Sequence, residues 1–424
     1  MFSENGIIAK AKEAAEKANQ AAINEQRQMN EVAGYLDNML NEIGGNTPPE
    51  EPTLPSDGSY SEEKGVNTPN LGEGMTPIKW DETKKDWVET YGSDPEWYNY
   101  GETESTRKWA NAKTSDGSMW VWIPRYAYSI TSGYHQSGAQ INPTTPAEGA
   151  GNIEVEFMKG LTNETSTGRT SFQNSSGQGK WNIHPAFSYG QTVSGIWVAK
   201  FEASNSGGKI KVEPGVQSWR SITVNDIYTN CLNYNKTLNS HMMKNDEWGA
   251  VAYLSKSKYG KNAEVTINSN SSYYTGGGSG NAYVSNIGQS TTGTVHGVYD
   301  MSGGAWEYVA AYVDNSYTTS YGSSLVNGDA KTKNVYSKAS TDNATNNYNA
   351  NSSKYGDAVY ETSTSGSGST SWYGDYSDFP NADGPFFQRG GHYTGGTDEG
   401  VFFFYNYYGG TSSYLSFRPV LVAF

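Results

Sequence analysis

Side chains that act in catalysis or bind metals are sparse in this sequence. The one cysteine, Cys231, has no second thiol to pair with, and we interpret it as a small buried hydrophobic residue. A zinc site needs several imidazole or thiolate ligands at short spacing, and the histidines show no such spacing. We therefore expect no bound metal and no cofactor. The five histidines are His135, His184, His241, His296 and His392.

Sequence motifs of the common enzyme classes are absent as well. The chain contains no HExxH, no GxSxG, no phosphate-binding P-loop and no GxGxxG after a strand. Acidic residues are plentiful, but the carboxylate pair of a glycoside hydrolase is recognised by its separation in space, which a sequence does not give. These patterns give no support to a simple catalytic function.

The composition excludes several other classes. Among 424 residues, 30 are Lys or Arg and 44 are Asp or Glu, so the net charge is −14, and no basic run is present to attract nucleic acid. No stretch of about 18 apolar residues exists to span a membrane, and a single cysteine excludes a disulfide scaffold. The 32 tyrosines lie among glycine, serine, asparagine and threonine, a mixture typical of binding surfaces but also of loop-rich β proteins without a binding role.

The elements that would position a binding surface are preceded by an N-terminal segment of different character. The sequence of residues 1–45 predicts a long helix. Good helix formers predominate, and apolar residues recur at alternating steps of three and four before Gly44-Gly45 ends the pattern. Such a helix either folds back on the main domain or acts as a stalk or assembly helix. Residues 46–75 carry several prolines among Glu, Ser and Gly and predict an extended linker.

Residues 76–424 predict a domain that combines strands and helices. Apolar runs at residues 119–123 and 195–201, bounded by turn residues, predict buried strands, and residues 416–424 predict a core strand at the end of the chain. The spacing of apolar residues over 241–254 predicts a helix.

The second half of this domain contains a long stretch of different composition. The sequence of residues 295–313 predicts a turn followed by a strand. Residues 314–378 are poor in apolar types and rich in Ser, Thr, Asn, Gly and Tyr. We expect them to form a polar insertion on the domain surface with ordered turns and few core residues.

Three segments, in this order, resemble the formylglycine-generating-enzyme (sulfatase-modifying factor) branch of the C-type lectin fold. They are His296–Val309 (HGVYDMSGGAWEYV), Gln388–Gly391 (QRGG) and Ser416–Val420 (SFRPV). They are similar to the family's GLYDMxGNVWEW core, its RGG and its closing GFR. The resemblance covers roughly residues 119–424, with long insertions, and implies an α+β, C-type lectin fold.

The same resemblance implies a structural framework. Gly303-Gly304 allows a tight turn, and the two arginines of the motifs are expected to be buried and paired rather than catalytic. The framework residues are Trp306, Glu307, Arg389, Gly390, Gly391, Phe417 and Arg418.

Departures from the family pattern indicate that this chain is not an enzyme of that type. The enzymes oxidise with two cysteines that follow the RGG motif, whereas His392, Tyr393 and Thr394 follow it here. Gly304 replaces the calcium-associated asparagine of the family, which argues against a calcium site at this turn, although Glu307 remains.

The C-terminal segment also resembles another class with this fold, the variable proteins of diversity-generating retroelements. In residues 390–417, the RGGxYxxG start, the GVFxF middle and the SFRPVLV end frame short clusters of unlike residues. In this class, mutagenesis directed at adenines rewrites Asn-type codons near the end of the gene. It yields residues such as Asn, Tyr, His, Asp, Ser, Thr, Gly, Phe and Leu. Between His392 and Ser416 the chain contains no Lys, Gln, Met or Trp, and Glu399 is the one exception, which we assign to the framework. An ordinary Tyr- and Gly-rich loop would often look similar.

This resemblance implies a ligand-binding face for a protein or glycan on another cell or particle. Exposed tyrosines within it would form an aromatic patch typical of a binding site. The residues expected to be displayed are His392, Thr394, Gly395, Thr397, Asp398, Phe403, Tyr405, Asn406, Tyr407, Tyr408, Gly410, Ser412, Ser413, Tyr414 and Leu415.

The start of the chain carries a third resemblance. Residues 4–11 (ENGIIAKA) are similar to the segment that follows the membrane helix in Gram-positive type IV pilin-like proteins. This implies a missing hydrophobic segment, a chain that is itself soluble, and a native protein on the cell surface or in a pilus-like assembly, with a phage or prophage origin left open. Alternatives are a fixed carbohydrate-binding adhesin, a pilus subunit and, disfavoured by the missing cysteine pair, a sulfatase-modifying-factor-type enzyme.

Overall fold

The computed structural model describes residues 60–134, 149–316 and 319–424. They belong to one compact unit, Pro55–Phe424. The helix expected over residues 1–45 and the linker up to residue 59 lie outside the described residues. The described part is a mixed α+β structure in which strands predominate and helices are few.

The first large sheet has seven antiparallel strands in the order β15-β23-β12-β8-β7-β3-β4. Every residue of β8 and β12 is buried, because their runs of Trp, Val and Ile face the core on both sides of the sheet. The strands predicted over 119–123 and 195–201 are thus confirmed. The strand bounds are His241–Met242 (β15), Pro419–Leu421 (β23), Gly195–Ala199 (β12), Met119–Pro124 (β8), Asn111–Thr114 (β7), Met75–Asp81 (β3) and Asp86–Glu89 (β4).

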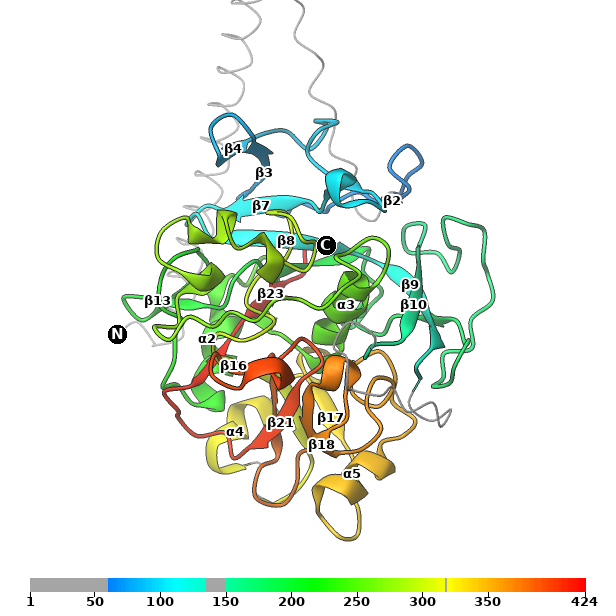
Figure 1. Cartoon of the computed structure of the whole chain (residues 1–424), viewed down its shortest axis with the longest axis vertical. Helices are drawn as coiled ribbons and strands as arrows, with labels where there is room; N and C mark the ends of the chain where they lie inside the picture. The colour runs from blue at the N-terminus through cyan, green and yellow to red at the C-terminus, as the bar shows by residue number, and fades with distance from the viewer. Residues whose placement is uncertain (1–59, 135–148, 317–318) are drawn as a thin grey trace, which may run out of the picture. The chain divides into compact units, whose positions relative to one another are not determined.

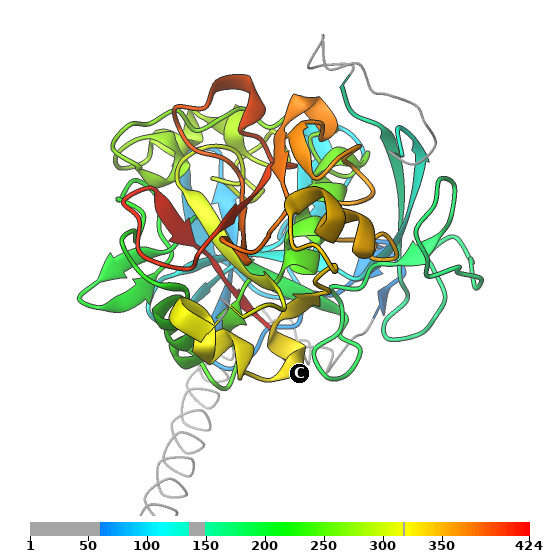
Figure 2. The ribbon, with the colours of Figure 1, turned by 90° about the horizontal axis from the view of Figure 1, so that it is seen from below.

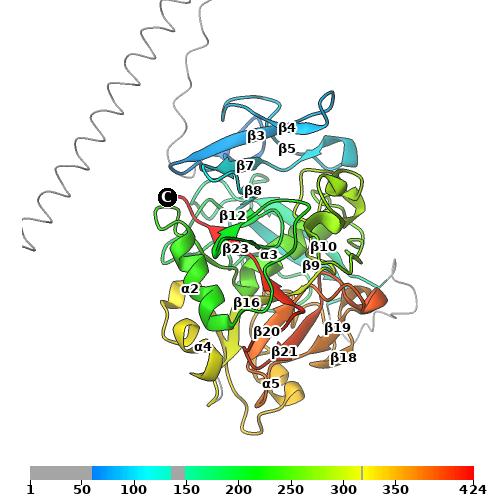
Figure 3. The same ribbon diagram turned by 90° about the vertical axis from the view of Figure 1, so that its left-hand side faces the viewer.

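The second large sheet has the order β17-β16-β20-β21-β19-β18, and β22 also pairs with β16. Figures 1 and 3 show β3, β7 and β8 of the first sheet in the upper half of the views and β18 and β21 of the second sheet in the lower half. The strand bounds are Asn334–Tyr336 (β17), Trp306–Val313 (β16), Phe386–Arg389 (β20), Phe404–Tyr407 (β21), Tyr376–Asp378 (β19), Ser367–Ser369 (β18) and Leu415–Phe417 (β22).

Smaller strand groups complete the β structure. Strand β9 lies between β10 and β11, and the remaining strands form the pairs β1–β2, β5–β6 and β13–β14. Their bounds are Tyr126–Ser132 (β9), Asn152–Phe157 (β10), Asn182–Ile183 (β11), Tyr60–Ser61 (β1), Val66–Asn67 (β2), Asn99–Tyr100 (β5), Arg107–Lys108 (β6), Ser204–Ser206 (β13) and Lys209–Lys211 (β14).

Four α-helices are described: α2, α3, α4 and α5. The helix predicted over 241–254 begins later, at Asn245. His241 and Met242 pair with β23 instead, and the Glu247 side chain accepts the backbone N–H of Lys244 at 2.8 Å, which caps the helix there. The bounds are Val224–Tyr234 (α2), Asn245–Lys256 (α3), Thr319–Val326 (α4) and Ala344–Ala350 (α5), with short 3₁₀ helices at Glu104–Thr106, Thr275–Gly277, Ala282–Val284, Ile287–Gln289, Ala330–Thr332, Trp372–Gly374 and Gly396–Asp398.

The described end of the predicted linker, residues 60–75, belongs to the domain. Val66 and Asn67 are buried. The Asn67 side-chain amide is satisfied there, because it donates to the carbonyl of Ser194 at 2.9 Å and accepts the backbone N–H of Gly160 at 2.7 Å. The extended linker therefore ends earlier than the proline pattern indicates.

The segment 314–378 is also more than a surface insertion. Its strands β17 and β19 pair with β16 and β21 inside the second sheet. Among its buried side chains are Tyr336, Tyr348 and Trp372, which join the common core. Most of the core side chains that this segment supplies are aromatic, so rings rather than aliphatic runs provide its apolar surface.

The helices offer no candidate for a membrane span. Among the residues described, no helix has the length and the apolar character that crossing a bilayer requires.

Candidate ligand-binding surface

The three sequence motifs meet on one strand, β16. Glu307 of β16 lies opposite Arg389 at the end of β20, in antiparallel register. On the other side of β16, Trp306 pairs in parallel register with Leu415 at the start of β22. The segment 390–415 therefore begins at β20 on one side of β16, contributes β21 to the same sheet, and ends at β22 on the other side of β16.

A buried ion pair holds this junction. Both carboxylate oxygens of Glu307 accept hydrogen bonds from Arg418, whose Nε lies 2.8 Å from Oε2 and 3.1 Å from Oε1, and Arg418 also donates to the carbonyls of Ala199 and Tyr299 at 3.0 and 3.1 Å. Both side chains are almost completely buried. Glu307 is thus engaged by a guanidinium, as expected for a framework residue.

Two further carboxylates lie near this pair. Burial, reinforced by the charges of Glu307 and Asp300, raises the pKa of Glu202 well above its usual range. Burial also raises the pKa of Asp300, although Arg418 opposes this. No group of three or more His, Cys, Asp or Glu within residues 60–134, 149–316 and 319–424 is placed to hold a metal ion.

Arg389 is buried as expected, but carbonyl groups rather than a carboxylate satisfy it. Its guanidinium donates to the carbonyls of Asp357 and Ala358 at 3.3 and 3.0 Å and to the Asn245 side chain at 3.2 Å. Burial lowers its pKa to about 10. It thereby ties the end of β20 to the segment before β18 and to the start of α3.

The turn after β20 depends on glycine. Gly390 and Gly391 have φ angles of 82° and 76°, a region that favours glycine. A Cβ on Gly391 would lie 2.4 Å from the Cβ of Glu399. Glu399 therefore occupies the space beneath this turn, in agreement with its assignment to the framework.

Above Glu399, aromatic rings from several elements form what we call the aromatic surface. Trp306, which is half-buried, lies at its centre, with ring centroids 6.4 Å from both Phe403 and Tyr405 in near-parallel stacks. Figure 1 shows β21, coloured orange-red, in the lower half of the view together with β16, and Figure 2 shows the same domain from below. The aromatic surface consists of Tyr273, Trp306, Tyr376, His392, Tyr393, Phe403, Tyr405 and Tyr414.

His392 connects the two sides of the aromatic surface. Its ring centroid lies 5.0 Å from that of Trp306 and 4.9 Å from that of Tyr414. Its Nε2 and the hydroxyl of Tyr273 are 2.8 Å apart, and its Nδ1 lies 2.9 Å from the hydroxyl of Thr394. Burial, with a further contribution from the charge of Arg220, lowers the pKa of His392 to about 4, so the imidazole is neutral at physiological pH.

A second group of tyrosines lies farther along the same segment. Tyr407 and Tyr408 have ring centroids 4.5 Å apart, and Tyr408 also contacts Tyr321 at 5.4 Å. Tyr408 is exposed, whereas Tyr407 is half-buried against Tyr308 of β16.

The predicted display residues divide into three groups by exposure. Five are exposed: Thr394, Thr397, Tyr408, Ser413 and Tyr414. Six are partly exposed: Gly395, Asp398, Tyr405, Asn406, Tyr407 and Ser412.

Four of the residues expected to be displayed are buried instead: His392, Phe403, Gly410 and Leu415. Leu415 is 0% exposed because β22 places it beside Trp306 in the sheet, and Phe403 lies under the rings of Tyr376 and Tyr405. His392 is held between its two hydrogen-bond partners. These four positions shape the surface from below.

The sequence patterns do not single out three residues of this region. Arg220 and Tyr273 lie more than 100 residues before residues 390–417 in the chain, and Tyr376 precedes the segment more closely; the fold brings all three to the surface. The guanidinium of Arg220 lies 3.9 Å from the ring centroid of Tyr273 and donates to the carbonyl of Ser413 at 2.6 Å. One signal for Tyr273 appears only in the backbone: its φ of 58° is uncommon for a residue other than glycine. The sequence alone does not show this.

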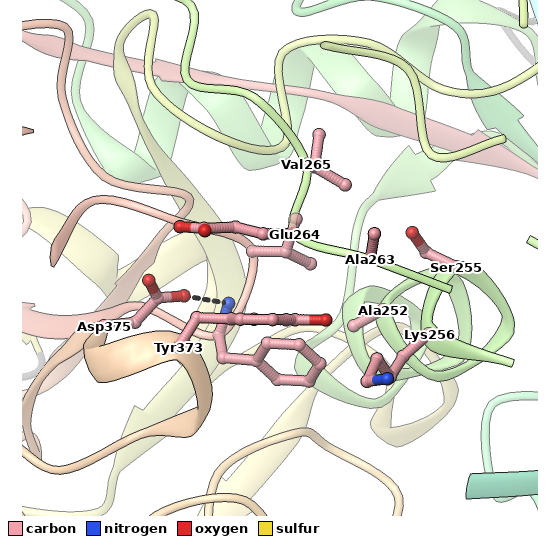
Figure 4. A pocket seen from close by; sticks show the side chains of 10 residues that line it. Ala252, Ser255, Lys256, Ala263, Glu264, Val265, Tyr373 and Asp375 are labelled. Atoms are coloured by element: carbon pink, nitrogen blue, oxygen red, sulfur yellow. Dashed lines mark hydrogen bonds between the residues drawn. The ribbon is translucent and has the colours of Figure 1, made fainter. Parts of the chain in front are cut away.

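Behind the surface, the middle of the segment is anchored by Asp375. Its buried carboxylate accepts the backbone N–H groups of Gly400 and Phe402 at 3.1 and 2.8 Å. Figure 4 shows Asp375 and Glu264 close together at the adjoining cavity, and burial raises the pKa of Asp375 well above its usual range. The cavity, about 10 Å³, has room for about one water molecule and is too small for a substrate.

Comparison with protein-family models and with curated proteins found no match for this chain.

Proposed function

We propose that this protein is a non-catalytic display protein whose C-terminal variable region, residues 390–417, binds changing partners and is diversified by a retroelement. In this proposal the domain has a C-type lectin fold of the formylglycine-generating-enzyme type. It is carried on the surface of a cell or particle by a pilin-like N-terminal helix. The partner is a protein or a glycan on another cell or particle.

One observation carries the proposal: Tyr405 and Tyr414, both at least partly exposed, lie around Trp306 in one aromatic surface, and the same anchored segment carries further exposed residues such as Thr394 and Tyr408. Both ends of the segment are fixed on β16, and its middle is fixed by Asp375. Exposed side chains on a rigid support, rich in tyrosine and small polar residues, are what a binding surface needs, because little conformational entropy is lost when it binds.

The rival enzyme function is disfavoured by the state of the one cysteine. Cys231 is completely buried in α2, and burial raises the pKa of its thiol well above the usual range. His392 follows the Gly390-Gly391 turn where the enzymes carry a cysteine. We expect no oxidation of cysteine-containing peptides when the protein is assayed with copper, and measurable turnover would contradict the proposal.

Sequencing this gene in sibling strains tests the diversification directly. We expect differences to concentrate at adenine-containing codons between His392 and Leu415, above all at Thr394, Thr397 and Tyr414. We also expect an imperfect repeat of the gene's end and a reverse transcriptase gene nearby. Differences spread evenly over the domain would overturn the proposal.

A pair of display libraries tests the binding capacity. One library varies the five exposed positions Thr394, Thr397, Tyr408, Ser413 and Tyr414 with Asn-type codons. The control library varies exposed apolar residues elsewhere, at Tyr91, Leu161, Ile287 and Val335. Both should fold, but only the first should yield binders to a panel of purified proteins and glycans. Equal yields from the two libraries would show that the surface has no special capacity.

A further inference from the structure

At the edge of the aromatic surface, Arg220 is a cation without a carboxylate partner. Among the residues that the structure describes, Arg169 and Arg418 each pair with a glutamate, whereas Arg107, Arg125, Arg220 and Arg389 form no ion pair. Of these four, Arg220 is the one that contacts a ring of the aromatic surface and the backbone of Ser413. An unpaired guanidinium presents a fork of N–H donors that matches the geometry of a carboxylate.

The position of this guanidinium is fixed from two sides. Its plane lies over the ring of Tyr273 at 3.9 Å, and Nη1 donates to the carbonyl of Ser413 at 2.6 Å. The Nε atom is buried and has no hydrogen-bond partner. Leaving a buried donor unsatisfied costs free energy, so this N–H is available to an acceptor from outside the chain.

A polar cavity of about 300 Å³ adjoins Arg220. Its lining offers amide and hydroxyl groups and one indole, from Asn205, Gln217, Ser218, Trp219 and Ser221. Hydroxyls and amides donate and accept hydrogen bonds, and an indole presents a flat apolar face. This combination suits one sugar ring, which has hydroxyls at its rim and an apolar face.

Backbone hydrogen bonds connect the segment that lines the cavity to the aromatic surface. The N–H of Ser221 donates to the carbonyl of Ser412 at 2.9 Å, and the N–H of Ser218 donates to the carbonyl of Tyr273 at 3.0 Å. Ser221 and Tyr273 both have positive φ, at 60° and 58°, which is uncommon for residues other than glycine and is found preferentially at functional sites.

We infer that Arg220 and this cavity form a fixed subsite for the carboxylate of an acidic sugar residue in a glycan. Arg220 would bind the carboxylate, the polar lining would bind the hydroxyls, and Tyr273 would hold Arg220 in place. The inference rests on the proposed binding surface and extends it. Because residues 205–221 lie outside the variable region, this contact is shared by all variants, while residues 392–414 determine what else is bound.

The test is a titration of the protein with methyl glucuronide, followed by NMR, with neutral methyl glucoside as the matched ligand. We expect the glucuronide to bind and the glucoside to bind at least about tenfold more weakly, because a hydrogen-bonded charge is lost. The variant Arg220→Gln should reduce glucuronide affinity by a similar factor, and Arg220→Lys should be intermediate. The control Arg107→Gln removes another arginine whose Nε is buried without a partner, at a separate groove, and should change nothing.

Three results would overturn the inference. Equal binding of both sugars would exclude carboxylate recognition, and equal loss in the Arg107→Gln control would place the site elsewhere. Binding of N-acetyl-aspartate amide in place of the glucuronide would show that Arg220 serves an acidic peptide instead of a glycan. Thermal unfolding of each variant separates loss of binding from loss of fold. None of these results bears on where sibling genes differ, so the subsite and the proposed variable region fail independently.

Discussion

The indole nitrogen of Trp306 donates a hydrogen bond to the carboxylate of Glu399 at 3.0 Å, and the same carboxylate oxygen accepts the backbone N–H of His392. One acidic side chain therefore positions both the central ring of the aromatic surface and the first residue after the Gly390-Gly391 turn. The surface depends on this residue, although Glu399 itself contributes little to the exposed face.

Glu399 should make the stability of the protein depend on pH. Burial raises its pKa from 4.5 to about 7, so between these values the folded protein holds a proton that the unfolded chain has lost. The free energy of unfolding should therefore decrease as the pH rises from 4.5 to 7. Glu399→Gln should remove this contribution. Urea unfolding of both proteins at pH 4.5, 6 and 7.5 gives the difference in their free energies of unfolding, in which the contributions of other buried acids cancel. A difference that does not change with pH would contradict the assigned pKa.

His392 should titrate in the opposite sense and report on Arg220. Its pKa is lowered from 6.5 to about 4, so the unfolded chain binds the additional proton first, and stability should decrease as the pH falls from 6.5 to 4. NMR of the imidazole should show a midpoint near pH 4. Because the charge of Arg220 contributes to the lowering, Arg220→Gln should move the midpoint upward, and an unmoved midpoint would place Arg220 away from the ring.

Leu415 and Tyr414 are neighbours with opposite expected sensitivities. Leu415 is completely buried and Tyr414 is 46% exposed. Leu415→Ala should reduce the free energy of unfolding by about 2–5 kcal/mol, since it leaves a cavity in the core. Tyr414→Ala should change it by about 0.5 kcal/mol or less. Chemical denaturation of both variants compares them, and a tolerant Leu415 would return that residue to the displayed set.

The pair of Glu307 and Arg418 should be costly to break from either side. Arg418→Gln should reduce the free energy of unfolding by about 3–5 kcal/mol, because it leaves a buried carboxylate without its cation. Glu202 and Asp300 lie near the same guanidinium, so this loss should exceed that of Glu307→Gln. Urea unfolding of both variants gives the order, and the reverse order would show that the other two acids are not coupled to Arg418.

Much of the fold is predictable where the local pattern and the burial agree. The strands β8 and β12 follow from unbroken apolar runs between turn residues. Helix α2 does not follow from its sequence, because Asn, Thr and Val are weak helix formers. It forms because Thr223 caps its first turn and because Val224, Ile227 and Cys231 are buried on one side.

The candidate site is predictable as a segment but not residue by residue. Framing motifs place the segment, yet the same residue alphabet includes both exposed tyrosines and the buried Leu415. The parallel register of β22 on β16 decides which of them face the core, and a register between distant strands is not encoded locally. For the same reason the sequence gives no signal for Arg220 and Tyr273.

The attachment of both ends of residues 390–415 to β16 has a consequence for how this segment can change. Its two anchor points are at a set separation, so exchanging one side chain for another leaves the path of the backbone intact. Adding or removing a residue within β22 would instead shift its register and turn Leu415 and Phe417 away from the core. The segment is therefore permissive toward base substitution, whereas a change of length within β22 disrupts the core.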